Sequence, residues 1–415
     1  MFQRIGPAAM KKDLGNIVAL LEYLGHPERK FESIHIAGTN GKGSTAHILT
    51  AALMGNGWKT GLYTSPHYRD FRERIKINGQ LIQKKQVTDF VAKHQTFIES
   101  IQPSFFEITV AMAFQCFADA GVQIAVIETG LGGRLDSTNV LNPLVSVITN
   151  IGYDHQQFLG ETLPEIAGEK AGIIKKGTPV IIGETQEEVR HVFRQKAIEL
   201  GAPLIYADQI YRTEVLSYSL TGMQVNLYER EKCVLENMST DLTGPYQAIN
   251  LTTAFATLDA LGNMYPDWRV PTDILPLVWK NIKKSTRLLG RWQLLSKNPL
   301  VLADSAHNKP GLELIFSRLK EIPFQNLHIV LGIVSDKDPH PVLSLFPKEA
   351  TYYFAKADIP RGLEAVKLQE AARQHELKGR TYVSVKRALA AAKRNANPDD
   401  LIFVGGSIFT VAEVI

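Results

Sequence analysis

Apolar residues alternate between helical and strand spacing over the first part of the chain. Between Leu14 and Leu24 they recur every three or four residues, which predicts a helix that Gly25 ends. A short strand around Ile34 and Ile36 then runs into a glycine-rich turn, and a second helical pattern follows directly. Strand, glycine-rich turn and helix in this order are typical of a phosphate-binding loop.

The alternation of strands and helices continues further along the chain. Apolar runs predict strands at 60–63, 122–128, 144–149 and 178–182, and helical spacing predicts helices near 107–120 and 162–174. The second of these helices begins with a capping-box pattern, Thr162 followed three residues later by Glu165. Such an alternation indicates a mostly parallel sheet covered on both faces.

The pattern changes between about 204 and 245, where short alternating segments predict antiparallel strands. A new alternation of strands and helices starts after Arg291. We therefore predict an α/β chain of two domains. Domain 1–290 has a P-loop-type, mostly parallel sheet with a small antiparallel β subregion, and domain 291–415 is a smaller Rossmann-like domain.

The composition narrows the class of protein. The 415 residues are 45% hydrophobic and 21% charged, and a net charge of +4 with both signs interleaved predicts neither a nucleic-acid partner nor a membrane surface. Cys116 and Cys233 alone give no disulfide framework, so a reducing compartment is expected. Residues 1–16 lack the apolar centre of a signal peptide, and no apolar run could span a bilayer. We expect a cytoplasmic protein.

The strongest local signal is the turn from Gly38 to Thr45, Gly38-Thr39-Asn40-Gly41-Lys42-Gly43-Ser44-Thr45. Backbone N–H groups of such a turn and of the helix start can bind phosphate, and Lys42 can neutralise it. Ser44 or Thr45 could support the metal or the phosphate. The turn departs from the common G-x-x-x-x-G-K-[ST] pattern, because Ile36 stands at the first glycine position and Gly43 separates Lys42 from Ser44.

Three polar side chains follow predicted strands and are candidate metal ligands. Glu128 ends an apolar strand before a glycine-rich loop, His155 follows the strand at 144–149, and Ser65 follows the strand at 60–63. The carboxyl ends of strands in an open α/β sheet are where ligands gather, and oxygen ligands suit Mg²⁺. Each residue alone could equally be a loop or turn residue.

The second domain offers a smaller set of polar candidates. Asp304 and His307 come just after a predicted strand, and Arg291 stands in the linker. An aspartate can accept a hydrogen bond from a ribose hydroxyl, and an arginine can reach phosphates. The alternative is an ordinary loop with polar capping residues.

Taken together, the motifs resemble those of the folylpolyglutamate synthase/dihydrofolate synthase family, a branch of the Mur ligase superfamily. They occur in the family's order from about residue 35 to 410, as GTNGKGST, TSPH, ERI, ETGLGGRLDSTN, ITNIGYDHQQFLG, EKAGII, GPYQAIN, GRWQ, DSAHN and SDKD. The resemblance implies an ATP-dependent ligase that adds L-glutamate to dihydropteroate or to reduced folates through an acyl phosphate, with release of ADP and phosphate. Many bacterial-type members carry out both reactions, and we expect both here.

The resemblance also implies roles for individual residues. ATP would lie between the domains, on Gly38 to Thr45 and on Asn250, Arg291, Asp304 and His307, and Mg²⁺, as two ions, would bind through Ser65, Glu128 and His155. The catalytic residues would be Lys42, His155 and Lys170, with Lys170 carried as a carbamate. A neutral amine captures CO₂, and the resulting anion can sit beside a second Mg²⁺. Without the resemblance, Lys170 would be a surface lysine of the helix at 162–174.

One hypothesis concerns the acceptor. The segment from Ser65 to Ile77 carries aromatic and basic residues, and we expect it to be a mobile loop in which Phe71 and Arg74 contact the folate. The alternative is a solvated charged loop.

Two other functions are compatible with parts of the sequence. A cell-wall Mur ligase would carry a UDP-binding domain of about a hundred residues before the phosphate loop, and the position of Lys42 leaves no room for one. A P-loop switch that is not a ligase would leave the ETGLGG, DHQQFLG and DSAHN segments unexplained. The family further suggests a monomer.

Overall fold

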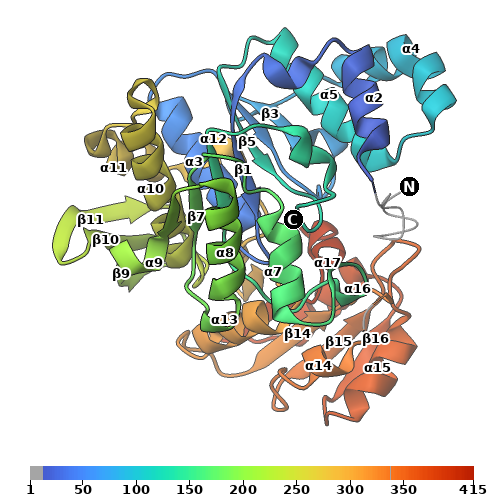
Figure 1. Cartoon of the computed structure of the whole chain (residues 1–415). Helices are drawn as coiled ribbons and strands as arrows, with labels where there is room; N and C mark the ends of the chain where they lie inside the picture. Colours follow the sequence, from blue (N-terminus) through green and yellow to red (C-terminus); the bar gives the residue numbers. More distant parts are fainter. Residues whose placement is uncertain (1–12, 337) are drawn as a thin grey trace. The chain divides into compact units, whose positions relative to one another are not determined.

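The computed structural model describes residues 13–336 and 338–415 (Figure 1). The first twelve residues, which form most of the run considered as a signal peptide, lie outside the described residues, as does Lys337 of the SDKD motif. None of the helices in the part of the chain that the structure describes combines the length and the hydropathy that a bilayer crossing requires.

The described residues divide into two compact units. The larger unit comprises residues 13–242 and 247–288, and the smaller unit comprises residues 243–246 and 289–415. The smaller unit therefore takes in a short segment far from the linker in sequence, which no local pattern indicates. We describe each unit by itself.

Within the described residues, the larger unit is built on an eight-stranded sheet. In spatial order its strands are β4 (Gln80–Leu81), β3 (Ile75–Ile77), β2 (Thr60–Tyr63), β5 (Ile124–Glu128), β1 (Glu32–Ala37), β6 (Val145–Ile148), β7 (Val180–Ile182) and β8 (Leu204–Tyr206). The six strands β2, β5, β1, β6, β7 and β8 run parallel to one another. Only β3 and β4, at one edge of the sheet, are antiparallel. The central strands β5 and β6 are buried along their whole length, as expected for a sheet covered on both faces.

Helices cover both faces of this sheet. They are α2 (Gly15–Tyr23), α3 (Lys42–Gly55), α4 (Lys84–Ile101), α5 (Phe105–Asp119), α6 (Gln156–Leu159), α7 (Leu163–Ala171), α8 (Glu187–Leu200), α9 (Ala207–Ile210), α10 (Gln247–Met264), α11 (Leu275–Trp279) and α12 (Ile282–Thr286). The capping box predicted for α7 is confirmed, because Thr162 Oγ1 accepts from the Glu165 N–H at 3.3 Å and the Glu165 carboxylate accepts from the Thr162 N–H at 3.0 Å. Helices α4, α8 and α10 were not predicted.

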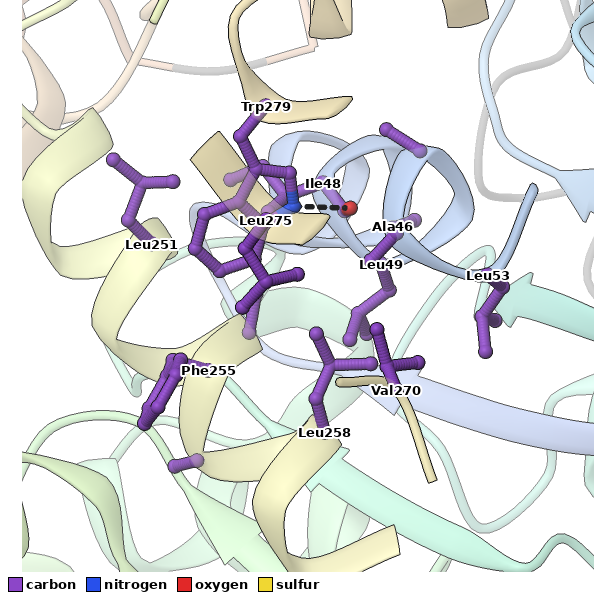
Figure 2. Close-up of a cluster of buried hydrophobic side chains, with 14 of the residues drawn as sticks. Ala46, Ile48, Leu49, Leu53, Leu251, Phe255, Leu258, Val270, Leu275 and Trp279 are labelled. Carbon is purple, nitrogen blue, oxygen red and sulfur yellow. Dashed lines mark hydrogen bonds between the residues drawn. The ribbon is translucent and has the colours of Figure 1, made fainter. Parts of the chain in front are cut away.

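Helix α3 forms the centre of a core on one face of the sheet. All ten residues from Ser44 to Leu53 are buried, because α10, α11 and α12 pack on the side of α3 that faces away from the sheet. Figure 2 shows Ile48, Leu49 and Leu53 of α3 among apolar side chains of α10 and α11. The indole N–H of Trp279 donates to the carbonyl of Ile48 at 3.2 Å. The helix that begins at the phosphate loop is thus fixed by a dense apolar core.

The antiparallel subregion is a separate sheet. It consists of β9 (Tyr211–Tyr218), β10 (Met223–Glu229) and β11 (Lys232–Thr240), with β10 in the middle. The antiparallel region expected from about 204 therefore begins later, since the strand Leu204–Tyr206 pairs in parallel with β7 at the edge of the large sheet. The apolar side chains of this small sheet pack against α10.

The smaller unit contains a six-stranded sheet within the described residues. In spatial order its strands are β12 (Gln293–Lys297), β13 (Leu300–Ala303), β17 (Leu401–Gly405), β14 (Leu327–Leu331), β15 (Thr351–Ala355) and β16 (Gly379–Tyr382). Only β12 runs antiparallel to its neighbour. The helices are α13 (Lys309–Leu319), α14 (His340–Leu343), α15 (Ala365–Arg373), α16 (Val385–Asn395) and α17 (Ile408–Ala412). The predicted α/β fold class, with a mostly parallel sheet, a small antiparallel subregion and a second α/β domain, is confirmed.

Candidate active site

The glycine-rich turn joins β1 to α3 and requires glycine at two places. Gly38 has φ +144° and Gly41 has φ +86°, conformations that L side chains rarely adopt. A Cβ on Gly38 would lie 1.9 Å from Thr149 Oγ1, and a Cβ on Gly41 would lie 2.4 Å from Asn250 Oδ1. Both glycines are therefore needed for the backbone path and for the close approach of neighbouring side chains.

The segment after β6 supports this turn. Thr149 Oγ1 donates to the carbonyl of Asn40 at 2.5 Å, and the N–H groups of Thr39 and Asn40 donate to the carbonyl and the side-chain oxygen of Asn150, both at 2.9 Å. We expected the N–H groups of the whole turn to bind phosphate, but these two serve the protein instead. Helix geometry leaves the first N–H groups of α3 without an intrahelical acceptor, and these remain for an anion.

Two lysine side chains meet at one carbonyl of the turn. Lys42 Nζ donates to the carbonyl of Gly38 at 2.9 Å and to that of Thr39 at 3.2 Å, and Lys170 Nζ from α7 donates to the same Gly38 carbonyl at 3.0 Å. Lys170 is only 4% exposed. Burial, and secondly the charge of Lys42, lower the pKa of Lys170 to about 7. A large fraction of Lys170 is therefore a neutral amine near neutral pH.

Glu128 lies at the carboxyl end of β5, beside the phosphate loop. Its side chain is 5% exposed, and a Cβ on Gly43 would lie 3.5 Å from Glu128 Oε2. The backbone N–H of Ser65 donates to the same oxygen at 3.2 Å. The structure thus brings Ser65, Glu128 and the phosphate loop together. A buried carboxylate beside a phosphate-binding loop places like charges in contact, which a divalent cation can offset.

The loop after Glu128 is held by an aspartate that we did not single out. One oxygen of Asp136 accepts from the N–H groups of Gly130 and Leu131, both at 2.8 Å, and the other accepts from the hydroxyl of Thr138 at 2.5 Å. Asp136 is 3% exposed, and this burial raises its pKa although the hydrogen bonds oppose the shift. Asp136 therefore has a structural role in the ETGLGGRLDSTN motif: its hydrogen bonds hold the glycine-rich loop that follows Glu128.

The third candidate ligand, His155, begins helix α6. It has φ +52°, and its Nε2 lies 3.6 Å from the carboxylate of Asp154. The negative charge of Asp154 raises the pKa of Lys170 and so partly opposes the effect of burial. Among the residues that the structure describes, no three His, Cys, Asp or Glu side chains form a group that could hold a metal ion. A divalent ion at Glu128 would thus need a hydroxyl, phosphate or water to complete its ligands.

Asn250 and Gln247 lie at the start of α10 and face the phosphate loop. Asn250 Nδ2 donates to Gln247 Oε1 at 2.9 Å, and Gln247 Nε2 donates to Ser44 Oγ at 3.3 Å. All three side chains are at most 4% exposed. Asn250 was predicted, whereas Gln247 was missed, because nothing in the sequence shows that this part of α10 packs on α3.

The segment considered as a folate loop is well packed in the structure. Phe71 to Arg74 form a short 3-10 helix, and the Glu73 carboxylate accepts from the N–H groups of residues 68, 69 and 70. Arg74 is 3% exposed, and its Nε donates to His67 Nδ1 at 2.9 Å. Burial, and secondly Arg74, lower the pKa of His67 to about 4, so His67 is neutral and can accept. The Phe71 ring packs on Phe105. The role of Phe71 and Arg74 in folate binding stays a prediction.

Asp304 occupies the end of β13 in the smaller unit. Its carboxylate accepts from the Tyr246 hydroxyl at 2.5 Å, from the Trp292 N–H at 2.6 Å and from the Ala306 N–H at 2.8 Å. Burial raises its pKa, and Arg291 is the largest influence in the opposite direction. We expected Asp304 to accept from a ribose, but the structure gives it three protein donors. It fastens the linker and residues 243–246 to the sheet.

The two other candidates of this unit lie beside Asp304. Arg291 Nη1 donates to the hydroxyl of Ser305, and His307 Nδ1 lies 3.0 Å from the Ser305 carbonyl. Arg291, Asp304 and His307 are therefore close together at the carboxyl end of β13, where ligands of open α/β sheets bind. Their contact with a nucleotide stays a prediction.

Comparison with known proteins now adds to this geometry. Residues 36–258 match the Mur ligase middle domain, and residues 290–408 match the Mur ligase glutamate ligase domain. The fold and the phosphate loop thus define an ATP-dependent ligase of the Mur type. The dihydrofolate synthase/folylpolyglutamate synthase of Bacillus subtilis is 34% identical over 98% of this chain and 94% of its own length, and that of Escherichia coli is 33% identical over 92% and 85%.

Solved structures agree with these relatives. The Escherichia coli FolC structure, a complex with DHPP and ADP, has a TM-score of 0.86 at 30% identity and covers 98% of this chain and 93% of its own. The bifunctional enzyme of Yersinia pestis, in complex with AMPPNP and a Mn ion, has a TM-score of 0.83 at 29% identity with the same coverage. The chain belongs to the dihydrofolate synthase/folylpolyglutamate synthase family, and it is an ATP-dependent ligase of folate polyglutamylation. The family assignment favours this function over a cell-wall ligase and over a P-loop switch.

Proposed function

We propose that the chain joins L-glutamate both to dihydropteroate and to reduced folates, and that the reaction takes place at the phosphate loop. The observation that carries this proposal is the convergence of Lys42, Lys170 and Glu128 on the turn from Gly38 to Gly43. The Lys42 cation at a glycine-rich turn suits the phosphates of ATP, and a buried carboxylate beside it suits a divalent ion.

The first chemical step is attack by a carboxylate oxygen of the acceptor on the γ-phosphorus of ATP. A new O–P bond forms, the bond between the γ-phosphorus and the bridging oxygen breaks, and ADP leaves with the electron pair. The product is an acyl phosphate. Lys42 offsets the repulsion between the two anions and the charge that develops on the phosphoryl oxygens. The N–H groups at the start of α3 hold the same phosphates.

The second step is attack by the α-amine of glutamate on the acyl carbon. The C–N bond forms, the C–O bond to phosphate breaks, and the amine loses a proton as phosphate leaves. The attacking nitrogen must be neutral, so its proton has to be removed before or during the step. His155 is counted among the catalytic residues as a predicted metal ligand, and it lies at the start of α6 beside Asp154.

The donor set fits a divalent cation. Ser65, Glu128 and His155 would hold Mg²⁺, and the contact of Ser65 with Glu128 and the approach of Glu128 to Gly43 support the first two of these ligands. When bound, Mg²⁺ supplies positive charge between phosphates and carboxylates. Manganese in the Yersinia pestis relative supports a metal of this type. We expect a second ion beside Lys170.

Lys170 has the properties that carbamate formation requires. Its pKa of about 7 leaves a neutral nitrogen available to attack the carbon of CO₂. The N–C bond forms, one C=O electron pair moves to oxygen, and the nitrogen loses a proton. The side chain then carries a negative charge where the reacting amine was neutral, and it can attract a second Mg²⁺. We propose that Lys170 is carbamylated in the active enzyme.

The complex of the Escherichia coli relative with DHPP supports a pterin-bearing acceptor here. The names of several relatives combine both synthase activities, which supports both reactions for this chain. A monomer is expected, with no nucleic-acid or membrane partner, and the cytoplasmic location expected from the sequence stays a prediction.

Glutamate-dependent release of ADP by the purified protein tests the proposed function. Dihydropteroate and tetrahydrofolate are supplied in separate reactions with MgATP. Release of ADP with both acceptors, abolished in Lys42→Ala, is the expected result. Release with only one acceptor would refute the bifunctional proposal, and full activity in Lys42→Ala would refute the role of the loop.

A further inference from the structure

Gln247 is a buried polar residue for which the reaction scheme gives no role. It is the first residue of α10 and is 1% exposed. Its two side-chain atoms bond in opposite directions: Oε1 accepts from Asn250, and Nε2 donates to Ser44 Oγ. An amide buried so completely needs partners at both ends, and it has them here.

The directions of these bonds depend on each other, because the two amides meet. If the Gln247 amide were turned over, its NH₂ group would face the NH₂ group of Asn250, and two donors would oppose each other. The Asn250 amide in turn lies against Gly41, with its Oδ1 2.4 Å from where a Cβ would be. In the arrangement observed, Ser44 Oγ is therefore an acceptor toward Gln247.

The hydroxyl proton of Ser44 is then left for another acceptor. A serine in a helix often donates to the carbonyl four residues earlier, which here is that of Asn40. Thr149 Oγ1 donates to that carbonyl at 2.5 Å, and the Ser44 hydroxyl donates to no acceptor within the part of the chain that the structure describes. Ser44 lies in the first turn of α3, where the helix start attracts anions. A phosphate oxygen is the acceptor that this position would meet.

We infer that Gln247 is a positioning residue of the phosphate loop: it holds Ser44 Oγ as an acceptor, so that Ser44 presents its proton to a phosphate oxygen of ATP. The inference rests on the proposed function, in which ATP phosphates occupy this loop. In this role Gln247 acts on the phosphate through Ser44. Through Asn250 and Ser44 it also ties α10 to both ends of the segment from Gly41 to Ser44.

A double-mutant cycle with Gln247→Met and Ser44→Ala tests this inference. Methionine has a similar length to glutamine but cannot donate to Ser44. We expect each single variant to raise the KM for ATP about 5- to 10-fold, as loss of one hydrogen bond predicts. The double variant should show no more than the Ser44→Ala effect, because Gln247 has no role once the hydroxyl is absent. The KM values for glutamate and for the acceptor should not change.

A matched control is available on the same helix. Thr257 is buried in α10, and its hydroxyl donates only to the local Thr253 carbonyl at 2.7 Å. Thr257→Val should therefore leave the KM for ATP unchanged. If Gln247→Met does not fold, Gln247→Glu replaces it, because its carboxylate accepts from Asn250 and captures the Ser44 proton. It should then raise the KM for ATP by a larger factor with Ser44 present than in the Ser44→Ala background.

The outcomes separate this inference from the proposed function. Absence of glutamate-dependent ADP release in the unchanged protein would overturn the proposed function. An active enzyme in which the effects of Gln247→Met and Ser44→Ala multiply, or in which Gln247→Met leaves the KM for ATP unchanged, would overturn the positioning role alone. A rise in the KM for glutamate equal to that for ATP would indicate general damage to the site and would also overturn it.

Discussion

Lys170 should make the fold less stable at neutral pH, so that removing its amine stabilises the protein. Burial and Lys42 lower the pKa of this amine from 10.5 to about 7. Between these two pH values the unfolded chain binds more protons than the folded protein does. The free energy of unfolding therefore rises with pH over this range, and the destabilisation is greatest below pH 7.

The size of the effect follows from the same two pKa values. An amine that titrates at 10.5 when unfolded and at about 7 when folded costs the fold about 4 kcal/mol at pH 7. Lys170→Met removes this cost together with the hydrogen bond to Gly38, which is worth about 1 kcal/mol. We expect the variant to be about 3 kcal/mol more stable at pH 7, and this advantage should shrink as the pH approaches 10.5. The same variant should lose glutamate-dependent ADP release, since it cannot form a carbamate.

Urea unfolding at pH 6, 7 and 9 measures the difference, in CO₂-free buffer without metal or nucleotide, so that the amine is not carbamylated. Lys176→Met is the matched control, because Lys176 is exposed and lies in a turn that follows the same helix. The control should change stability little at any of these pH values. Equal or lower stability of Lys170→Met at pH 7, or an advantage that does not fall with pH, would refute the reasoning.

Three further substitutions test the packing around the site. Gly38→Ala places a Cβ 1.9 Å from Thr149 Oγ1 and should cost about 3 kcal/mol in thermal unfolding. Gly57→Ala, where φ is also positive (+93°) but the space is open, should cost about 1 kcal/mol. Asp304→Ala leaves three donors without their acceptor and should destabilise the smaller unit by about 3 kcal/mol, measured by limited proteolysis under native conditions. Trp279→Phe should cost about 1–2 kcal/mol of stability with unchanged kcat; a changed kcat would contradict its purely structural role.

Local patterns predicted the central strands of the large sheet and the helices α3, α5 and α7, whereas α4 and α8 were missed although each has an exposed side. The turn from Gly38 to Thr45 was recognisable because glycines at fixed positions separate a buried strand from a helix. Helix α10 was missed for the opposite reason: it is covered on nearly all sides, so its apolar and small residues show no polar face. Gln247 was missed with it, since its partner Ser44 is 203 positions away in sequence.

Charged residues show a second limit of predicting a site from the sequence. Arg74 and Asp304 are buried and have protein partners, and their expected contacts with a folate and a ribose stay predictions. A polar residue after a strand can bind a ligand or satisfy nearby backbone and side-chain groups, and its sequence context is the same in both cases. Only the contacts of the folded chain separate the two possibilities.

The charges around Lys170 also predict an order of events. Carbamate formation needs the neutral amine, and the nearby charge of Lys42 helps to keep it neutral. Phosphates bound on the loop would add negative charge beside Lys170, raise its pKa and slow its reaction with CO₂. Protein freed of CO₂ should therefore regain activity faster when bicarbonate is added before ATP than when ATP is added first. The measurement is the lag before steady ADP release in the two orders of addition, and equal lags would contradict this coupling.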